Sequence, residues 1–317
     1  MDLPFPNFLN PNERYYWGWI VCYAVIAFIF AFKRNNLKSA LLSIFPRNLY
    51  LSQDALLTYK LYLATMWVPI YVSGLLFKYH EQIFVGPIKT ILLAVHLKVG
   101  IFANEHEILS NLCFSFLMLL AIDIADTAHH ILFHKIPFLW EFHKVHHSAT
   151  APNIMAASRM HPVEKTVQVT MIMASTIFCN FLVTNLLGHQ PAGFFVANVS
   201  FALLIRHIFE LLRHSHVRIS FGFLEYIFSS PSMHQIHHSI DPKHYNKNFA
   251  STFSLFDLMM GSIYRPQKNE SIIWGIQPEA WGQRNFGTVL GNLIHPFMPV
   301  FLLRRLKPDS SKMNSTA

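Results

Sequence analysis

Three groups of closely spaced histidines constrain the fold of this chain more than any other feature. They are His130-x3-His134, His143-x2-His146-His147 and His234-x2-His237-His238. Residues three and four apart on a helix project from the same face, so each group can direct two or three ring nitrogens at one point. With 19 histidines in 317 residues, a given position starts a His-x2-His-His motif by chance roughly twice in ten thousand, so two copies indicate a function. Imidazole is the commonest metal ligand of proteins near neutral pH, and the pattern is typical of a metal site.

The composition indicates an integral membrane protein. The chain is 52% hydrophobic and only 13% charged, and its charged share is about half that of soluble domains. Several apolar runs are long enough to cross a bilayer. The net charge of +8 comes from lysines and arginines that flank these runs, without a basic stripe of interleaved aromatics. This pattern favours positive-inside membrane topology over a nucleic-acid partner.

The cysteines and the N-terminus exclude other classes. Cys22, Cys113 and Cys179 each lie in a different apolar run, which predicts neither a disulfide framework nor a CxxC metal site. Residues 1–14 are polar and interrupted by prolines, unlike a signal peptide, so the first membrane helix is expected to target the chain.

The apolar runs predict the helices of the N-terminal half. Membrane-spanning helices are expected over Tyr15–Phe32, over Leu56–Phe77 with a kink at Pro69, and from Ile108 to about Ala128. Residues 82–103 are interrupted by lysines and a histidine, which favours an interfacial or re-entrant helix. Pro137 is expected to end the third helix.

The second half is predicted to begin with a short helix over Leu139–Ser148 and a helical hairpin. The arms of the hairpin, Lys165–Gly188 and Pro191–Leu212, each reach roughly 30 Å at ~1.5 Å per residue, and the turn GHQPAG joins them. A hairpin returns the chain to the side it left, so the histidines at 130–161 and those at 214–244 should share one face. The flanking lysines and arginines predict that this face is cytoplasmic.

The fold class expected is therefore an all-α integral membrane protein. It would have roughly four or more transmembrane helices, interfacial helices, and a cytosolic histidine-rich cap that holds a di-metal site. Gly261–Asn285 is expected in the cap, Asn285–Leu303 as an amphipathic or interfacial helix, and the tail as disordered. The predicted division is an N-terminal anchoring part (1–107), a catalytic region (108–266) and a C-terminal cap, interfacial helix and tail (267–317).

Ten histidines have a spacing or position that suits metal ligation. They are His130, His134, His143, His146, His147, His161, His214, His234, His237 and His238. Ten nitrogen ligands are too many for one ion and suit two. Two closely spaced ions serve catalysis more often than structure. His161 has the alternative of a hydrogen-bonding role at the start of a helix.

Two carboxylates accompany the first histidine group. Asp123 and Asp126 lie in an apolar helix, where unpaired carboxylates are costly, and they share the face of His130. We expect them to accept the free imidazole N–H groups and so to fix the rings. The alternative is ordinary pairing with a basic residue.

The remaining histidines have weaker patterns. His129 lies on another helical face from His134 and is expected to pack or to form hydrogen bonds, while His207, His216 and His244 could be ligands but lack paired spacing. Five others, expected to be interfacial or solvated, are His80, His96, His106, His189 and His295. Glu210 lies one turn before His214 and could be a carboxylate ligand or an ion-pair partner of a neighbouring arginine.

Together these motifs resemble the fatty acid hydroxylase/sterol desaturase superfamily of membrane di-iron oxygenases. The matching segments are Asp123 followed after six residues by His130-x3-His134, LWEFHKVHHS at 139–148, RMHPVE at 159–164, the single His214, SPSMHQIHHS at 230–239 and KNFASTFSLFDLMMGSIYRP at 247–266. The resemblance covers about half of the chain. Two departures, His129 after Ala128 and His216 two residues after His214, fall where the family often has other residue types and could reshape the substrate pocket.

The resemblance implies an enzyme with two Fe ions held by the clustered histidines and with O2 as co-substrate. Its substrate would be a lipid from the bilayer, such as a sterol, a fatty acyl chain or an alkylglycerol, and analogy favours hydroxylation over desaturation. Electrons would come from a separate NAD(P)H-dependent donor chain, cytochrome b5-like or ferredoxin-like with a reductase. A histidine-rich transition-metal transporter or metal-binding membrane protein is the alternative, but it would place ligands near the bilayer midplane rather than outside the apolar runs.

Overall fold

The structure is helical almost throughout. The computed structural model describes residues 15–33, 36–79, 82–83, 86–87, 90, 107–187, 193, 195–196, 199–267, 270–277 and 286–298. The first 14 residues, most of the interfacial segment predicted at 82–103 and the predicted disordered tail lie outside the described residues.

Twelve helices and one small hairpin make up the described elements. The helices are α1 (Trp17–Phe32), α2 (Leu37–Leu42), α3 (Arg47–Tyr50), α4 (Gln53–Thr65), α5 (Trp67–Lys78), α7 (Glu107–Lys135), α8 (Pro137–His147), α9 (Pro162–Leu187), α10 (Phe201–His214), α11 (Pro231–His237), α12 (Leu255–Met260) and α14 (Val289–Ile294). The 3-10 turns are η3 (Ala156–Ser158), η4 (Gly222–Tyr226), η5 (Pro242–His244) and η6 (His295–Phe297). β1 (Phe195–Val196) pairs antiparallel with β2 (Val199–Ser200).

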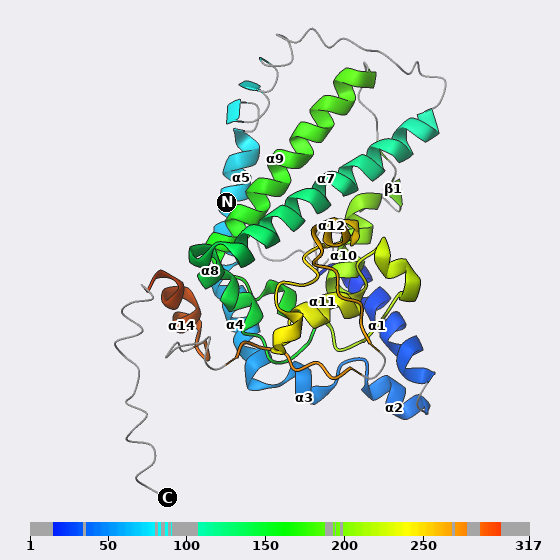
Figure 1. Cartoon of the computed structure of the whole chain (residues 1–317), viewed down its shortest axis with the longest axis vertical. Helices are drawn as coiled ribbons and strands as arrows, with labels where there is room; N and C mark the ends of the chain where they lie inside the picture. Colours follow the sequence, from blue (N-terminus) through cyan, green and yellow to red (C-terminus); the bar gives the residue numbers. More distant parts are fainter. Residues whose placement is uncertain are drawn as a thin grey trace, which may run out of the picture.

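Three helical stretches of the described chain are long and apolar enough to cross a membrane. They cover Gln53–Leu76, Ile108–Lys135 and Pro162–Asn185. α7 and α9 run antiparallel, with α5 beside α9. The shorter helices α8, α10 and α11, which carry histidines, lie toward one end of this bundle (Figure 1). The apolar α1 has 16 residues, about 24 Å, and is shorter than the hydrocarbon core.

The second span is interrupted where a proline kink is expected. α4 ends at Thr65 and α5 begins at Trp67, so the interruption is at Met66. Pro69 has no N–H to bond the carbonyl four residues earlier, which is that of Thr65, and the break between the two helices therefore agrees with the predicted kink.

The predicted helical hairpin is only half correct. Its first arm is α9, but α10 has 14 residues, about 21 Å, and begins at Phe201 rather than Pro191. Gly193 has a φ of 80°, which a helix cannot continue through, and the β-branched and aromatic residues after it form β1 and β2. The return arm is therefore too short to cross a bilayer, although it still brings His214 back toward the other histidines.

The chain breaks between α7 and α8 at Pro137, as predicted, although α8 begins earlier than expected. α7 ends at Lys135, and Pro137 occupies the first turn of α8, which begins two residues earlier than expected. Ile136 between them has extended backbone, as the residue before a proline prefers. This sharp turn places the three histidines of α8 beside the end of α7.

Two sets of contacts stabilise the helices around the histidines: an apolar core between α1 and α10, and hydrogen bonds to the start of α4. Trp19 and Tyr23 of α1 pack with Leu211 and Leu212 of α10. The side chain of Asp54, at the start of α4, accepts hydrogen bonds from the backbone N–H groups of residues 150 and 151, at 3.0 and 3.1 Å. These contacts fix the loop that leaves α8.

The C-terminal part is less helical than predicted. Of the helix expected over Asn285–Leu303, the described residues 286–298 contain α14, which Thr288 caps by accepting a hydrogen bond from the N–H of Gly291 at 3.0 Å. Pro296 in η6 follows its end. The described residues of the predicted cap, 261–267 and 270–277, contain no helix and lie against the histidine cluster through Trp274.

Candidate metal centre

Nine buried or half-buried histidines converge into two neighbouring groups. The first group is His130, His134, His143, His147 and His237; the second group is His146, His214, His234 and His238. Within each group, one ring nitrogen of every histidine lies within 4.8 Å of the others. α7 contributes only to the first group and α10 only to the second, whereas α8 and α11 contribute to both. The structure thus brings together nine of the ten predicted ligands.

α8 and α11 both begin with a proline. Pro137 and Pro231 occupy the first turn of each helix, where the fixed φ of proline suits a helix and its missing N–H needs no partner. The hydroxyl of Ser230 caps α11 by accepting from the N–H of Met233 at 3.3 Å. Gln235 donates to the carbonyls of Ser215 and Val217, both at 2.9 Å, and so ties α11 to the segment that follows α10.

The spacing of the ring nitrogens matches the geometry of shared ions. In the second group, the Nε2 atom of His214 lies 3.3 Å from that of His146 and 3.1 Å from that of His234. In the first group, the Nε2 atoms of His134 and His147 are 3.1 Å apart. Two nitrogens bound to one ion at about 2.0–2.1 Å lie about 2.8–3.4 Å apart for ligand angles between about 90° and 109°. The observed separations are of this size.

Backbone carbonyls set which nitrogen of each ring is free to bind an ion. His214 Nδ1 lies 3.1 Å from the carbonyl oxygen of Glu210, and His146 Nδ1 lies 3.3 Å from that of Arg159. A carbonyl can only accept, so each Nδ1 carries the hydrogen and each Nε2 of a neutral ring presents a lone pair. Two lone pairs that face each other at 3.3 Å are stabilised by a cation between them.

The same orientation recurs in the first group. His130 Nδ1 donates to the carbonyl of Phe249 at 2.8 Å, and His237 Nδ1 donates to that of Lys247 at 2.7 Å. His143 Nδ1 lies 2.5 Å from the carboxylate of Glu164, which is fully buried. The Nε2 atoms of these three histidines are buried and have no protein partner among the described residues. Buried polar atoms are normally satisfied, so three orphaned nitrogens in one group fit a bound ion.

Burial keeps the site histidines neutral. It lowers the pKa of His143, His146, His147, His234, His237 and His238 well below 6.5, and the neighbouring histidines lower these pKa values further. The unprotonated ring is the form that binds a metal ion, so the groups are ready to coordinate at neutral pH.

His161 is the one predicted ligand that lies outside both groups. Its Nε2 donates to the carbonyl of Leu293 at 3.2 Å, and its Nδ1 accepts from the N–H of Val163 at 3.1 Å. Both nitrogens are therefore occupied by backbone groups, and His161 has the alternative role of a hydrogen-bonding residue at the start of α9.

Asp123 and Asp126 do not contact the imidazoles as predicted. Asp123 accepts hydrogen bonds from the backbone N–H groups of Thr252 and Phe253, at 2.6 and 2.9 Å. Asp126 forms a buried ion pair with Arg206 at 2.5 Å. The orienting role belongs instead to the backbone carbonyls and to Glu164. The sequence signal for Glu164 was its position in RMHPVE, three residues after His161, which places it in the first turn of α9.

The residues with weaker sequence patterns contact groups outside the two histidine groups or pair with neighbouring side chains. Glu210 is ion-paired with Arg213, and its carboxylate lies 3.6 Å from His214 Nδ1. His216 Nε2 donates to the carbonyl of Ser43 at 2.8 Å, and His244 Nε2 donates to Glu270 at 3.0 Å. His207 packs near Trp19, with ring centroids 6.2 Å apart. None of these histidines belongs to either group.

His295 is half-buried in η6, and its ring lies 6.3 Å from that of Phe286. The other four histidines expected to be interfacial or solvated, His80, His96, His106 and His189, lie outside the described residues.

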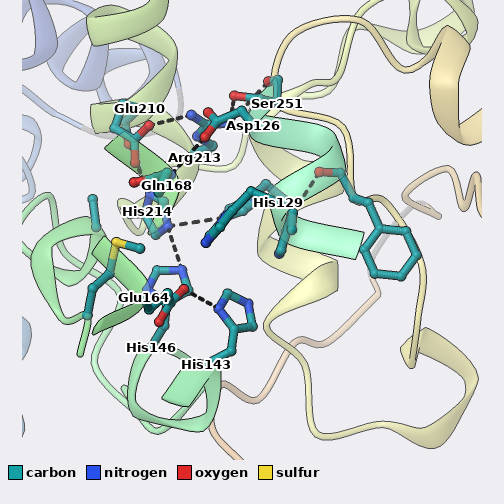
Figure 2. Close-up of a pocket in the computed structure, with 15 residues that line it drawn as sticks. Asp126, His129, His143, His146, Glu164, Gln168, Glu210, Arg213, His214 and Ser251 are labelled. Carbon is teal, nitrogen blue, oxygen red and sulfur yellow. Dashed lines mark hydrogen bonds and ion pairs between the residues drawn. The ribbon is translucent and has the colours of Figure 1, made fainter. Parts of the chain in front are cut away.

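A small cavity of about 50 Å³ adjoins both groups (Figure 2). Its lining combines histidines of the two groups with polar and charged side chains; these are His130, His143, His146, His214, His234, Asp126, His129, Glu164, Gln168, Glu210, Arg213 and Ser251. His129 packs on Phe133 as expected of a non-ligand, yet its buried Nε2 has no protein partner among the described residues. The cavity can hold a few water-sized molecules beside the histidines.

Trp274 covers the second group from the C-terminal segment. Its ring stacks on that of His238 with centroids 4.6 Å apart and an interplanar angle of 7°. The N–H of Gly275 donates to the carbonyl of His238 at 3.3 Å, and Ser239 forms a bridge with Trp274. Nothing in the spacing of the histidines pointed to this tryptophan.

The comparisons with known proteins agree with this geometry. Residues 115–262 match the family of fatty acid hydroxylases. The chain is 27% identical to alkylglycerol monooxygenase of Xenopus tropicalis over 160 residues, which are 50% of this chain and 32% of that protein. It is 27% identical to cholesterol 25-hydroxylase of Mus musculus over 198 residues, or 61% of each chain. It is 28% identical to an ornithine lipid hydroxylase of Rhizobium tropici over 150 residues, which are 46% of this chain and 40% of that protein.

The chain thus spans about a third of the length of the alkylglycerol monooxygenase that it matches. No solved structure matches it. All nine histidines of the two groups lie within the matched residues 115–262.

Proposed function

Because the chain belongs to the fatty acid hydroxylase/sterol desaturase superfamily, we propose that it is a membrane-bound, O2-dependent di-iron enzyme that hydroxylates an unactivated C–H bond of a lipid. The observation that carries the proposal is the convergence of nine histidine nitrogens into two adjacent groups. A single structural zinc site needs about four ligands, so a second buried group beside the first favours a catalytic pair of ions.

The first group would hold one iron and the second group the other. The chemistry that such a pair supplies is the reductive activation of O2, which no amino-acid side chain can perform. The chain's own residues contribute orientation, because the carbonyl of residue 249 and the carboxylate of Glu164 aim His130 and His143. They also contribute exclusion of water, since seven of the nine histidines are at most 6% exposed: His143, His146, His147, His214, His234, His237 and His238.

The cavity beside the groups supports the reaction class. It touches histidines of both groups and carries polar lining from Gln168 and Arg213, so a small reactant would lie next to both ions. Arg213 is fixed there by Glu210 and by the Ser251 hydroxyl at 2.7 Å. These side chains would hold the reactants while the bulk of a lipid remains outside the 50 Å³ space.

The substrate would be a lipid such as a sterol, a fatty acyl chain or an alkylglycerol. The relatives named above act on lipids of different classes, and three helical stretches of this chain can place the enzyme in the bilayer where such molecules reside. Hydroxylation is favoured over desaturation because these relatives are named as hydroxylases or monooxygenases. The electrons would come from a separate NAD(P)H-dependent chain with a cytochrome b5-like or ferredoxin-like donor, and the histidines would face the cytoplasm.

A histidine-rich metal transporter is the weaker alternative. A transport path would place ligands along the spans, near the bilayer midplane. Within the spans of the described chain, only His130 and His134 contribute to the groups, and both lie in the last two turns of α7. This distribution favours an enzyme.

Metal analysis of the purified protein tests the proposal. We expect about two irons per chain in detergent-purified wild type and depletion in the double variant His147→Ala/His238→Ala, which removes one ligand from each group. His216→Gln is the matched control, because this half-buried histidine lies outside both groups and bonds a backbone carbonyl. Product analysis with added reductant, O2 and lipid extracts should then show a lipid that has gained one oxygen atom. No bound metal, or equal metal in the wild type and the double variant, would contradict the proposal.

A further inference from the structure

Two short segments outside the spans expose an unusual number of large apolar side chains. Residues 221–228 contain η4, and residues 254–261 contain α12. Their exposed apolar side chains are Phe223, Leu224, Tyr226, Ile227, Phe228, Leu255, Leu258, Met259 and Met260, which we call the apolar patch. Phe223 is 73% exposed and Met259 is 77% exposed. Contiguous exposed apolar surfaces of this kind mark contacts with proteins or membranes.

The two segments form one continuous surface. The hydroxyl of Ser254 donates to the carbonyl of Glu225 at 2.6 Å, which ties the start of α12 to η4. The N–H of Ser229 donates to the carbonyl of Thr252 at 2.8 Å. The rings of Phe228 and Phe253 lie 5.8 Å apart. Phe253 therefore lies at the junction of the two segments.

The carboxylates of these segments point inward. Glu225 and Asp257 are the only acidic residues in the two segments, and they are 1% and 0% exposed. Glu225 accepts from the hydroxyl of Ser230 at 2.7 Å, and Asp257 accepts from the N–H groups of residues 249 and 250, both at 2.8 Å. The outward face of the apolar patch therefore carries no charge. A surface that faced water would ordinarily carry these carboxylates on its outside.

Cationic side chains stand at the two ends of the apolar patch. Arg265 donates to the carbonyl of Gly222, at the start of η4, at 2.9 Å, and its Nε lies 3.5 Å from the buried carboxylate of Glu225. Lys247 donates to the carbonyl of Gly261, at the end of α12, at 3.3 Å. An uncharged apolar centre between basic residues is the pattern of a surface that lies in the headgroup region of an anionic bilayer.

The apolar patch continues the membrane-facing surface of α7. Phe116 of α7 is 51% exposed within the candidate span Ile108–Lys135, and its ring lies 5.9 Å from that of Phe253. α12 lies beside α7 in Figure 1. The lipid that surrounds α7 would therefore reach the apolar patch without a polar interruption at this contact.

We propose that the apolar patch is a membrane-inserted surface. η4 and α12 enter the boundary between headgroups and acyl chains in the leaflet nearest the histidines, and Arg265 and Lys247 lie at the level of the headgroups. Ser251, which lines the cavity, is followed directly by Thr252 and Phe253, whose N–H groups bond Asp123, and then by the first residue of the apolar patch segment. The insertion depends on neither the identity of the metal nor the reaction.

Site-directed spin labelling in nanodiscs of mixed neutral and anionic phospholipid tests the insertion. The native Cys22, Cys113 and Cys179 are first replaced by serine, and a nitroxide is attached at Phe223→Cys or Met259→Cys. Tyr245→Cys and Ile273→Cys are matched controls, because these side chains are also exposed, at 45% and 64%, but lie outside the apolar patch. Monodisperse elution of each labelled protein establishes that it is folded.

The measured quantity is the collision rate of the label with oxygen, which partitions into lipid, relative to a water-soluble nickel chelate. We expect oxygen to dominate at positions 223 and 259 and the nickel chelate to dominate at positions 245 and 273. The same preference for the nickel chelate at all four positions would overturn the proposal. Protection from both agents at 223 and 259, with dipolar broadening between labels, would also overturn it, because that result means a second copy covers the apolar patch.

Discussion

Replacing Glu164 with glutamine distinguishes the contribution of this residue to metal affinity from its contribution to folding stability. The carboxylate of Glu164 is fully buried, and one oxygen accepts from His143 Nδ1 at 2.5 Å. Its other oxygen has no protein partner among the described residues. A glutamine of the same size can still accept from His143, but it carries no negative charge. The variant therefore changes the electrostatics of the first group and little else.

The charge should act in opposite directions with and without metal. A carboxylate behind a ligating imidazole raises its basicity, and loss of such a partner typically costs 10- to 100-fold in metal affinity, or about 1.4 to 2.7 kcal/mol. Without a cation, a buried carboxylate is an uncompensated charge, and burial of charge is unfavourable. We therefore expect metal-free Glu164→Gln to be at least as stable as the metal-free wild type, and the metal-bound variant to be less stable than the metal-bound wild type.

Two measurements check this reversal. Competition with a chelator gives the metal affinity, and unfolding in detergent with and without metal gives the stability of each form. Glu225→Gln is the control, since this carboxylate is also buried but its partners are serine hydroxyls and, at 3.5 Å, Arg265 rather than a histidine. An unchanged metal affinity together with a destabilised metal-free Glu164→Gln protein would refute the reasoning and make Glu164 a purely structural residue.

Three further predictions concern the scaffold. Arg159→Met should lower the free energy of unfolding by about 3 to 5 kcal/mol, because Arg159 is 1% exposed and pairs with Asp54 at 2.5 Å; Arg159→Met combined with Asp54→Asn should lose less than the sum of the single changes in denaturant unfolding. Trp274→Ala should speed the removal of metal by a chelator, because it deletes the ring stacked on His238, whereas Trp274→Phe should stay close to wild type. Metal-free protein should lose stability as the pH falls below about 6.5, by up to about 1.4 kcal/mol per site histidine and pH unit. The reason is that these histidines have a lowered pKa in the folded protein, so only the unfolded chain binds protons in this pH range. Equal free energies of unfolding at pH 7.5 and 5.5 would contradict this.

The long apolar helices and the grouping of the histidines were predictable because each has a strong local signal. An apolar run such as the one that became α7 specifies a helix by its length and composition, and a histidine pair at helical spacing specifies a shared direction. Eight of the nine histidines in the two groups come from such motifs, and His214 joins them from α10 without a paired neighbour. His161 also has no paired neighbour, and its place was decided by the backbone of residue 293, which is 132 residues away in sequence.

The partners of the ligands were not predictable, because they come from tertiary contacts. The acceptors for His130 and His237 are backbone carbonyls, which every residue has, so the sequence contains no signal for them. The carboxylate of Asp123 was instead taken up by the N–H groups of residues 252 and 253, a contact between segments 129 residues apart. The shortened α10 had a local cause that was open to prediction, since a glycine and a β-branched, aromatic segment precede it.

The division of the histidines between the two groups follows one geometric rule. On a helix, residues i and i+4 differ by about 40° in direction, whereas i+3 and i+4 differ by about 100°. In α8 the i, i+4 pair belongs to the first group and the i+3 histidine to the second; in α11 the assignment is reversed, and the i, i+4 pair of α7 stays together. The His-x2-His-His motif of α8 thus gives its pair to the first group, and that of α11 gives its pair to the second.

The unequal size of the groups comes from α7 and α10, because α8 and α11 together give three histidines to each group. The first group receives a pair from α7, a pair from α8 and one histidine from α11, which gives five nitrogens. The second group receives one histidine from α8, a pair from α11 and only His214 from α10, which gives four. An ion in the second group would therefore keep more positions free for a reactant than an ion in the first. Because α10 supplies one histidine where α7 supplies two, the side of the centre next to α10 would be the more open one.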